Sequence, residues 1–132
     1  MSIRYLSENE KYKLYSLHES VYLKDKSKSK KLCDYEGSDT FVTSVYGDPD
    51  SALLSFDGTF ICVAGCGITI YFIETKTCIE LFNEPDDITW TEGVYQSAED
   101  EPNYVRFNAY TETEKFAINK LNVKTNELKV LS

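Results

Sequence analysis

The hydrophobic residues are most concentrated between Ser55 and Phe82, where short apolar segments are separated by glycine-containing and polar turns. Asp57-Gly58 and Gly65-Cys66-Gly67 interrupt this stretch, and glycine favours turns because it accepts positive φ without a Cβ clash. The segments between these turns are rich in branched and aromatic residues, which suit a pleated sheet. The pattern therefore predicts an antiparallel meander of three strands, Thr59–Ala64, Ile68–Ile73 and Cys78–Phe82.

Both sets of alternate positions in this meander are apolar. One set comprises Phe60, Ala64, Ile68, Ile70 and Phe72, and the other comprises Ile61, Val63, Tyr71 and Ile73. A sheet with two apolar faces is typical of one that is covered on both sides. By the same alternation, Cys62 and Cys66 are expected on the face of Phe60 and Phe72, as small apolar core residues.

The strand–turn–strand pattern returns at a spacing of fifty residues, which places Ile73 on Val123 and on Leu23. The predicted downstream strands are Phe116–Val123 and Leu128–Leu131, and the upstream ones are Lys13–Leu17, Ser20–Leu23 and Lys30–Tyr35. The second repeat is expected to begin with Thr40–Tyr46 or Ala52–Phe56, and the third with Asp87–Trp90 followed by Tyr104–Tyr110. Ser2–Leu17 carries the only weak helical pattern.

Repeats of about 40–50 residues built from short antiparallel strands are typical of β-propeller blades. Three such repeats are too few to close a ring of the usual kind, which takes about four or more blades. The sequence therefore predicts a single all-β domain over residues 1–132, with antiparallel meanders in an open half-propeller-like array of blade-like sheets. A β-sandwich is the alternative.

The charge is distributed unevenly around a net value of −8. Lys24–Lys31 is a basic run, whereas Glu84–Glu101 holds seven carboxylates and no Lys or Arg. Such a balance repels phosphate backbones and anionic lipid, so nucleic acid and membranes are not expected partners. It favours a basic protein partner, although acidity that only aids solubility is the simpler alternative.

Aromatic residues interrupt the acidic segment, and together they form the predicted partner-binding set: Glu84, Asp86, Asp87, Trp90, Glu92, Tyr95, Glu99, Asp100, Glu101 and Tyr104. Aromatic side chains supply rigid buried area, and carboxylates steer a basic partner and pair with its Lys and Arg. The alternative interpretation makes Trp90 a core residue of its strand and leaves the carboxylates in solvent.

No catalytic, cofactor or metal site is expected from the sequence. His18 is the single histidine, and its neighbours Leu17 and Glu19 indicate a turn. Gly65-Cys66-Gly67 lacks the following helix and Lys of a phosphate loop, and Asp48-Pro49-Asp50 lacks the rest of a calcium loop. The N-terminal residues lack the apolar region of a signal peptide, so we expect a cytoplasmic protein with reduced cysteines.

Two resemblances follow. The stretch that begins Ser55-Phe56-Asp57-Gly58 and continues through Ile70–Ile73 and Thr75–Thr77 resembles a propeller blade. In profile, the small, acidic, all-β chain resembles the immunity proteins of bacterial toxin systems, including contact-dependent growth inhibition. That resemblance implies a non-enzymatic inhibitor of a toxin domain, a basic nuclease in many cases, whose active site it blocks with carboxylates in the place of phosphates.

Two other classes remain open at this point. A scaffold or subunit module would dock through an open sheet edge, because such edges pair with other chains unless they are charged or covered. An enzyme or small-ligand binder would need a pocket with converging polar groups.

Overall fold

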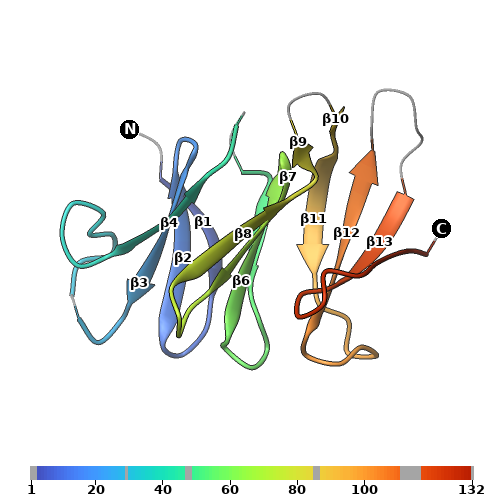
Figure 1. Ribbon diagram of the computed structural model, residues 1–132. Coiled ribbons are helices and arrows are strands. Elements are labelled where there is room, and N and C mark those ends of the chain that lie inside the picture. The colour runs from blue at the N-terminus through green and yellow to red at the C-terminus, as the bar shows by residue number, and fades with distance from the viewer. Residues whose placement is uncertain (1–2, 29, 47–48, 85–86, 111–116, 132) are drawn as a thin grey trace.

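The protein is described here by a computed structural model that covers residues 3–28, 30–46, 49–84, 87–110 and 117–131 (Figure 1). Its described residues form three four-stranded antiparallel sheets, called blades 1 to 3. Blade 1 comprises β1 (Ile3–Glu8), β2 (Tyr12–Leu17), β3 (Ser20–Asp25) and β4 (Thr40–Ser44). Blade 2 comprises β5 (Ser51–Leu54), β6 (Phe60–Gly65), β7 (Gly67–Phe72) and β8 (Thr77–Leu81). Blade 3 comprises β11 (Trp90–Tyr95), β12 (Tyr104–Tyr110), β13 (Ala117–Asn122) and β14 (Leu128–Val130).

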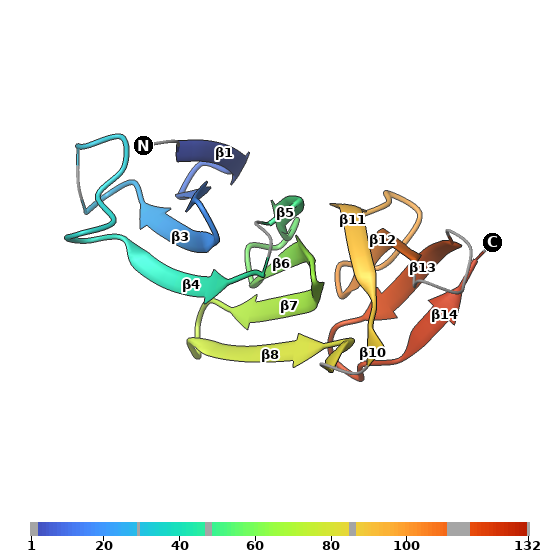
Figure 2. The ribbon, with the colours of Figure 1, turned by 90° about the horizontal axis from the view of Figure 1, so that it is seen from above.

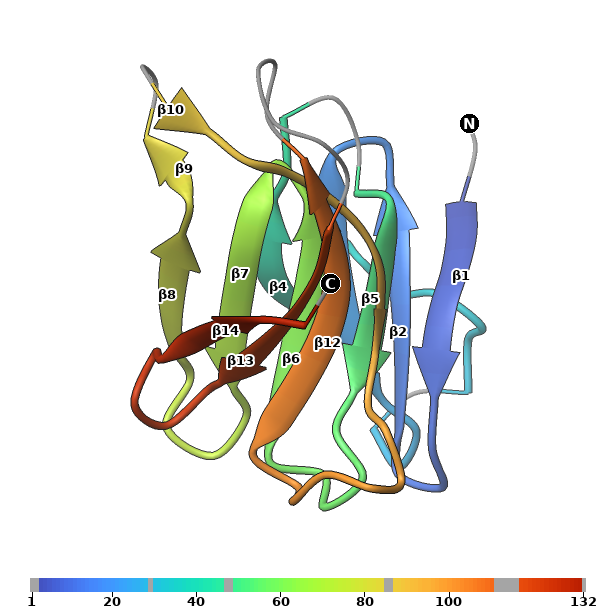
Figure 3. The same cartoon turned by 90° about the vertical axis from the view of Figure 1, so that its right-hand side faces the viewer.

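The three blades stand side by side along an arc (Figure 2). Within each blade the strands follow one another in chain order, so each sheet is a meander. The first strands, β1, β5 and β11, line the inner side of the arc, where β1 lies against β5 and β11 lies against β5 and β6. A short ribbon of β9 (Asn83–Glu84) and β10 (Asp87–Ile88) joins blades 2 and 3 at the upper end of the molecule (Figure 3).

Blade 2 is covered on both faces, as its alternation predicted. Phe60, Cys62, Ala64, Ile68 and Ile70 join a core cluster with residues of blade 3, including Val105, Phe107 and Leu121. Ile61, Val63 and Tyr71 join a second cluster with residues of blade 1, including Leu14, Val21 and Leu23. The open array of blade-like sheets is therefore confirmed, and the described residues show no β-sandwich of two facing sheets.

The fifty-residue spacing is confirmed between β7 and β13, but it fails in blade 1, where β3 begins 47 residues before β7. Residues 30–39 form turns and bends, so the strand predicted at Lys30–Tyr35 is wrong. The outermost strand is instead Thr40–Ser44, which pairs with β3 and does not open the second blade. The cause is a longer connection between the third and fourth strands than in the other two blades.

Three smaller expectations also need correction. Ile3–Glu8 is a strand rather than a helical segment. Asp87–Ile88 belongs to the ribbon with β9, so blade 3 begins at Trp90. Cys66 packs against the blade 1–blade 2 cluster and not beside Cys62, because it occupies the turn that reverses the chain. The start of the predicted strand at Phe116 lies outside the described residues.

The turn around Cys66 depends on glycine. Gly67 has φ +67°, and a Cβ at this position would collide with the carbonyl oxygen of Leu81 and approach the backbone of Asn83. A glycine is therefore required for β6 and β7 to connect so tightly beside the β8–β9 segment. In the described part of the chain, no helix has the length and apolar character that crossing a bilayer requires.

Candidate functional site: an acidic upper rim

The structure divides the predicted acidic surface between two ends of blade 3. We call the end that carries β9 and β10 the upper rim, and the end that carries the loop Gln96–Asn103 the lower rim (Figure 1). Glu84 and Asp87 belong to the upper rim, and Glu99 and Glu101 to the lower one. Strand β11 separates them by about 20 Å, at roughly 3.3 Å per residue. Asp86 lies outside the described residues.

Asp100 has a structural role in the lower rim. Its carboxylate accepts hydrogen bonds from Arg106 Nε at 2.8 Å and Nη2 at 2.9 Å, and it lies 3.1 Å from Lys120 Nζ. The side chain is only 3% exposed, and the hydrogen bonds from Arg106 lower the pKa of its carboxyl group. Lys120 Nζ also lies 4.5 Å from the centre of the Tyr104 ring. Asp100 therefore holds the loop against β12 and β13, and its carboxylate does not face solvent. Tyr104 contributes to the contact between β12 and β13.

Tyr95 and the two remaining carboxylates of this loop are exposed. Tyr95 ends β11 opposite Arg106, while Glu99 and Glu101 lie on the solvent side of the loop. These three side chains lie at the lower rim, away from Trp90 and Glu92 at the other end of the strand.

Trp90 and Glu92 line a hollow of about 320 Å³ at the upper rim. Its other described lining residues come from all three blades and include Arg4, Tyr46, Asp50 and Tyr110. Trp90 is half-buried and belongs to neither core cluster, so it is not simply a core residue of its strand. The first turn of β11 is fixed by Thr91, whose Oγ1 donates to Gly67 O at 2.5 Å and accepts from Gly65 N at 2.8 Å.

Hydrogen bonds hold the wall of this hollow in place. Arg4 donates to the carbonyl oxygens of Pro49 at 2.8 Å and Asp50 at 2.6 Å, which ties blade 1 to the start of blade 2. Asp50 Oδ2 accepts from Gly93 N at 3.1 Å, and Ser51 Oγ accepts from Val94 N at 2.9 Å. These side chains satisfy N–H groups on the inner edge of β11, which would otherwise lack partners.

A second hollow of about 460 Å³ adjoins the first through Tyr46. It lies between blades 1 and 2, and its described lining includes Glu80, Asn83, Thr69 and Cys66. Tyr46 lines both hollows and is 74% exposed. Among the described lining residues, the carboxylates are Asp50, Glu80 and Glu92 and the one basic residue is Arg4. None of the three carboxylates forms a salt bridge within the described residues.

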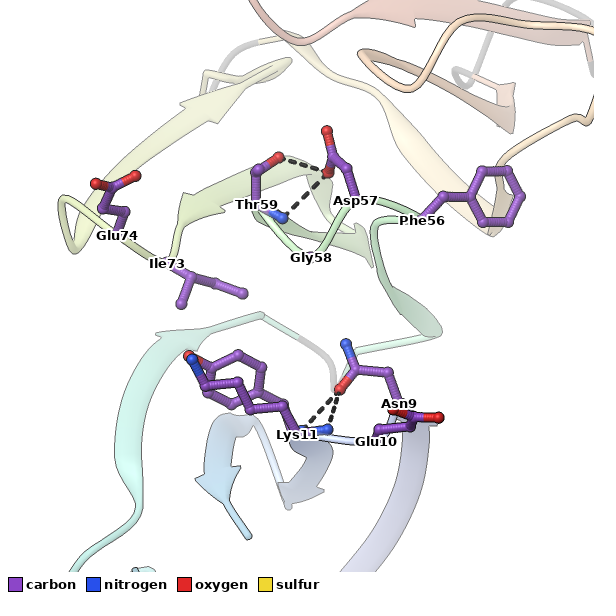
Figure 4. A pocket seen from close by; sticks show the side chains of 10 residues that line it. Asn9, Glu10, Lys11, Phe56, Asp57, Gly58, Thr59, Ile73 and Glu74 are labelled. Carbon is purple, nitrogen blue, oxygen red and sulfur yellow. Dashed lines mark hydrogen bonds between the residues drawn. The ribbon is translucent and has the colours of Figure 1, made fainter. Parts of the chain in front are cut away.

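The lower rim contains a larger hollow, of about 630 Å³, between blades 1 and 2 (Figure 4). Its polar groups stabilise turns. Asp57 accepts hydrogen bonds from Thr59 N at 3.1 Å, Thr59 Oγ1 at 2.7 Å and Ser55 Oγ at 2.8 Å. Burial raises the pKa of Asp57, but these hydrogen bonds outweigh it and the net shift is downward. Phe56 points away from the hollow, and Asn9 Oδ1 accepts from the backbone of Lys11 and Tyr12.

Residues for redox or metal chemistry do not converge in the described part of the chain. No group of three His, Cys, Asp or Glu side chains there could hold a metal ion. His18 is exposed at the β2–β3 turn with φ 54°, in agreement with its predicted turn position. Burial raises the pKa of the Cys62 thiol, which keeps it protonated and unreactive.

Comparison with known proteins supports the fold. No protein-family model matches the sequence, and the comparison with curated proteins gives no match. Among solved structures, the chain is similar to a β-propeller protein from Agrobacterium tumefaciens assigned as TolB, with a TM-score of 0.67 and 13% sequence identity. The match covers 100% of this chain and 50% of that protein, so the chain spans about half of its length. At this identity the likeness shows the fold alone: three consecutive blades of the propeller type.

Sequence reasoning found Trp90, Glu92 and Glu84 of the upper rim but missed Tyr46, Asp50 and Glu80. Tyr46 and Asp50 lie in the connection between blades 1 and 2, and Glu80 lies on β8. Nothing in their local sequence indicates that they line the two hollows of the upper rim. Only the arrangement of the three blades brings them together.

Proposed function

We propose that the protein is a binding module whose upper rim receives a basic protein partner. The observation that carries this proposal is the set of three carboxylates, Asp50, Glu80 and Glu92, which line adjoining hollows without salt bridges in the described chain. Tyr46 and Trp90 stand beside them as aromatic anchors. Carboxylates that form no salt bridge attract Lys and Arg of a partner, and aromatic side chains next to them provide the area that holds it.

The specific form of this proposal is neutralisation of a toxin. In a bacterial immunity role, the upper rim would cover the cationic groove where a basic toxin domain, such as a nuclease, binds phosphates. The hollows would receive protruding Lys or Arg side chains, and the carboxylates would replace the phosphates electrostatically. This role is non-catalytic and takes place in the cytoplasm.

A pull-down from lysate at low salt tests the binding proposal with three forms of the protein. The first is the wild type, and the second carries Asp50→Asn, Glu80→Gln and Glu92→Gln at the upper rim. The third, a matched control of equal charge change, carries Glu10→Gln, Glu74→Gln and Glu101→Gln at the lower rim. We expect wild type and control to retain one stoichiometric basic protein that salt elutes, and the upper-rim variant to lose it.

Equal retention by all three forms would overturn the assignment of the upper rim. For the toxin form of the proposal, the retained protein is tested for nuclease activity with and without the wild-type protein. Inhibition at a one-to-one ratio supports neutralisation, whereas a partner with no toxic activity, or one whose activity persists in the complex, contradicts it.

A second candidate function is a scaffold module that docks through a sheet edge. It is favoured by β14, an edge strand that pairs only with β13 in the described chain and exposes Leu128 and Val130. Such an edge can add a strand from another protein. Replacing Val130 with Lys would then abolish assembly at any salt concentration, whereas binding through the upper rim would be unchanged.

A further inference from the structure

The connection between the third and fourth strands differs among the blades. In blades 2 and 3 it is short, Ile73–Lys76 and Val123–Glu127, whereas in blade 1 it runs over residues 26–39. Its longer described part, residues 30–39, lies beside the outer face of blade 1, the face turned away from blade 2 (Figure 2). We call residues 30–39 the cap.

Beneath the cap, four aromatic residues form a row across blade 1. Strand register places Tyr5 opposite Tyr15, Tyr15 opposite Tyr22, and Tyr22 opposite Phe41. The rings of Tyr15 and Tyr22 stack at 5.6 Å, and those of Tyr22 and Phe41 meet edge-on at 5.9 Å. Tyr15 is 0% exposed, but Tyr5 and Phe41 at the two ends of the row are each more than half exposed. In blade 2, both apolar faces are covered by neighbouring blades. The aromatic row is a comparable apolar face on the side of blade 1 that has no neighbouring blade in the described chain.

The cap covers the centre of the row through a buried polar cluster. Asp39 accepts hydrogen bonds from Tyr15 OH and from Asp34 N, each at 2.5 Å. Lys24 Nζ lies 3.9 Å from Asp39 Oδ1, and both side chains are almost fully buried. Lys24 thus places a buried positive charge beside the Asp39 carboxylate.

Two further contacts extend the attachment of the cap. Tyr35 packs on Tyr22 with ring centres 5.9 Å apart, and Lys13 Nζ donates to the carbonyl oxygen of Leu32 at 3.4 Å. The cap is therefore bound to β2 and β3 by side chains along its length, not only at its ends.

We propose that the cap takes the place of a neighbouring blade and prevents the chain from closing a ring with a second copy of itself. The chain covers 50% of the length of the propeller protein that it resembles, and its three blades form an open arc. A contact between blade 1 and the partner's blade 3, repeated once by symmetry, would join two such arcs into a ring. The outer side of blade 3 carries Arg106, Asn108 and Tyr110 on alternate positions of β12, and Arg106 there is bound to Asp100. The cap covers the surface of blade 1 that the partner's blade 3 would contact, so the capped chain is a monomer.

Replacement of residues 26–39 by the short connection Ile73–Lys76 tests the proposal. The wild type should have the monomer mass of 15.1 kDa by light scattering at every concentration. The cap-shortened variant should approach twice that mass at concentrations of roughly 10–100 μM, the range of a modest interface. A wild-type dimer, or a folded cap-shortened chain that stays monomeric, would overturn the proposal.

A point variant keeps the proposal testable if the shortened chain fails to fold. Asp39→Ala removes the acceptor of Tyr15 and Asp34, and Glu36→Ala, an exposed position in the same cap, is its control. In Asp39→Ala, hydrogen exchange of amides in residues 33–39 should accelerate about tenfold or more while β6 and β7 stay protected. Unchanged exchange in the cap would contradict its attachment through Asp39, and equal acceleration in Glu36→Ala would show that the cluster is not the anchor.

Discussion

The upper and lower rims contain similar residues but use them differently. At the lower rim, Asp100 is bound by Arg106 and Lys120, Asp57 by Ser55 and Thr59, and Glu8 forms a salt bridge with Lys26. At the upper rim, Asp50, Glu80 and Glu92 line hollows and form no salt bridge in the described chain. Acidic composition alone therefore does not define a binding surface. The pairing of each carboxylate decides whether it stabilises the fold or remains available to a partner.

The difference has an energetic basis. A carboxylate that accepts several hydrogen bonds stabilises the folded state, and removing it leaves its donors without an acceptor. An unpaired carboxylate at the surface contributes little to folding, yet it adds to the field that steers a basic partner. Substitutions in the two rims should therefore separate stability from binding.

The largest effect on stability is expected for Asp100→Ala. This change removes the acceptor of both Arg106 and Lys120 and should lower the free energy of unfolding by about 2 kcal/mol. Urea unfolding followed by fluorescence measures it. Glu99→Ala, one residue away and exposed, is the matched control and should stay within about 0.5 kcal/mol of wild type. Equal effects of the two substitutions would refute the structural role of Asp100.

Asp57→Ala should have a smaller effect, about 1 kcal/mol, because its hydrogen bonds close a single turn at the β5–β6 connection. Glu74 lines the same lower hollow and has no hydrogen bond among the described contacts. Glu74→Ala should therefore leave the free energy of unfolding nearly unchanged. Thermal unfolding of both variants gives the comparison. If Glu74→Ala lost as much stability as Asp57→Ala, the stabilising interactions would come from the hollow itself and not from the turn.

Two carboxyl groups of the lower rim should contribute to the pH dependence of stability. Hydrogen bonds from Arg106 lower the pKa of Asp100, and those from Thr59 and Ser55 outweigh burial at Asp57. A carboxyl group with a lowered folded-state pKa adds stability above its unfolded-state pKa and loses it as the pH falls through the folded value. Stability should therefore decline below about pH 4, where aspartate ordinarily titrates. In urea titrations at several pH values, Asp100→Asn should flatten this decline, and an unchanged slope would contradict it.

The smallest effect on stability is expected for the triple upper-rim variant with Asp50→Asn, Glu80→Gln and Glu92→Gln. Asn at position 50 still accepts from Gly93 N, and neither glutamate has a salt bridge to lose in the described chain. The unfolding free energy should remain within about 0.5 kcal/mol of wild type, with a change toward greater stability as like charges are removed. A large loss in urea unfolding would mean that the upper rim supports the fold.

The sequence predicted blade 2 well because its signals are local. Alternation assigned Phe60 and Ile61 to opposite faces, and glycine turns marked the ends of β6 and β7. The same approach missed the strand β1, because Ile3–Glu8 has an exposed and irregular pattern. It found the strand at Thr40–Ser44 but left its blade uncertain between the first and second, because this strand follows a connection of unusual length. A repeat spacing holds only while the connections keep their length.

The candidate site was predicted only in part for a related reason. Trp90 and Glu92 stood out by composition, but so did Asp100 and Tyr104, which turn inward to Arg106 and Lys120. Local sequence does not show which carboxylates find a cationic partner, because Lys120 lies twenty positions from Asp100 and on another strand. The same holds for Tyr46, which lines the same hollow as Trp90 only because the blades pack together.

The central claim is that the upper rim binds a basic partner through Asp50, Glu80 and Glu92, which form no salt bridge in the described chain. The most direct test is an equilibrium titration of the retained partner against the wild type, the upper-rim triple variant and the lower-rim triple control. At low salt, the upper-rim variant should bind at least about tenfold more weakly, at roughly 1.4 kcal/mol for a tenfold change, and its affinity should depend less on salt. The control should match the wild type. Equal affinities for the two triple variants would contradict the account, because they would show that net charge, and not the upper rim, governs binding.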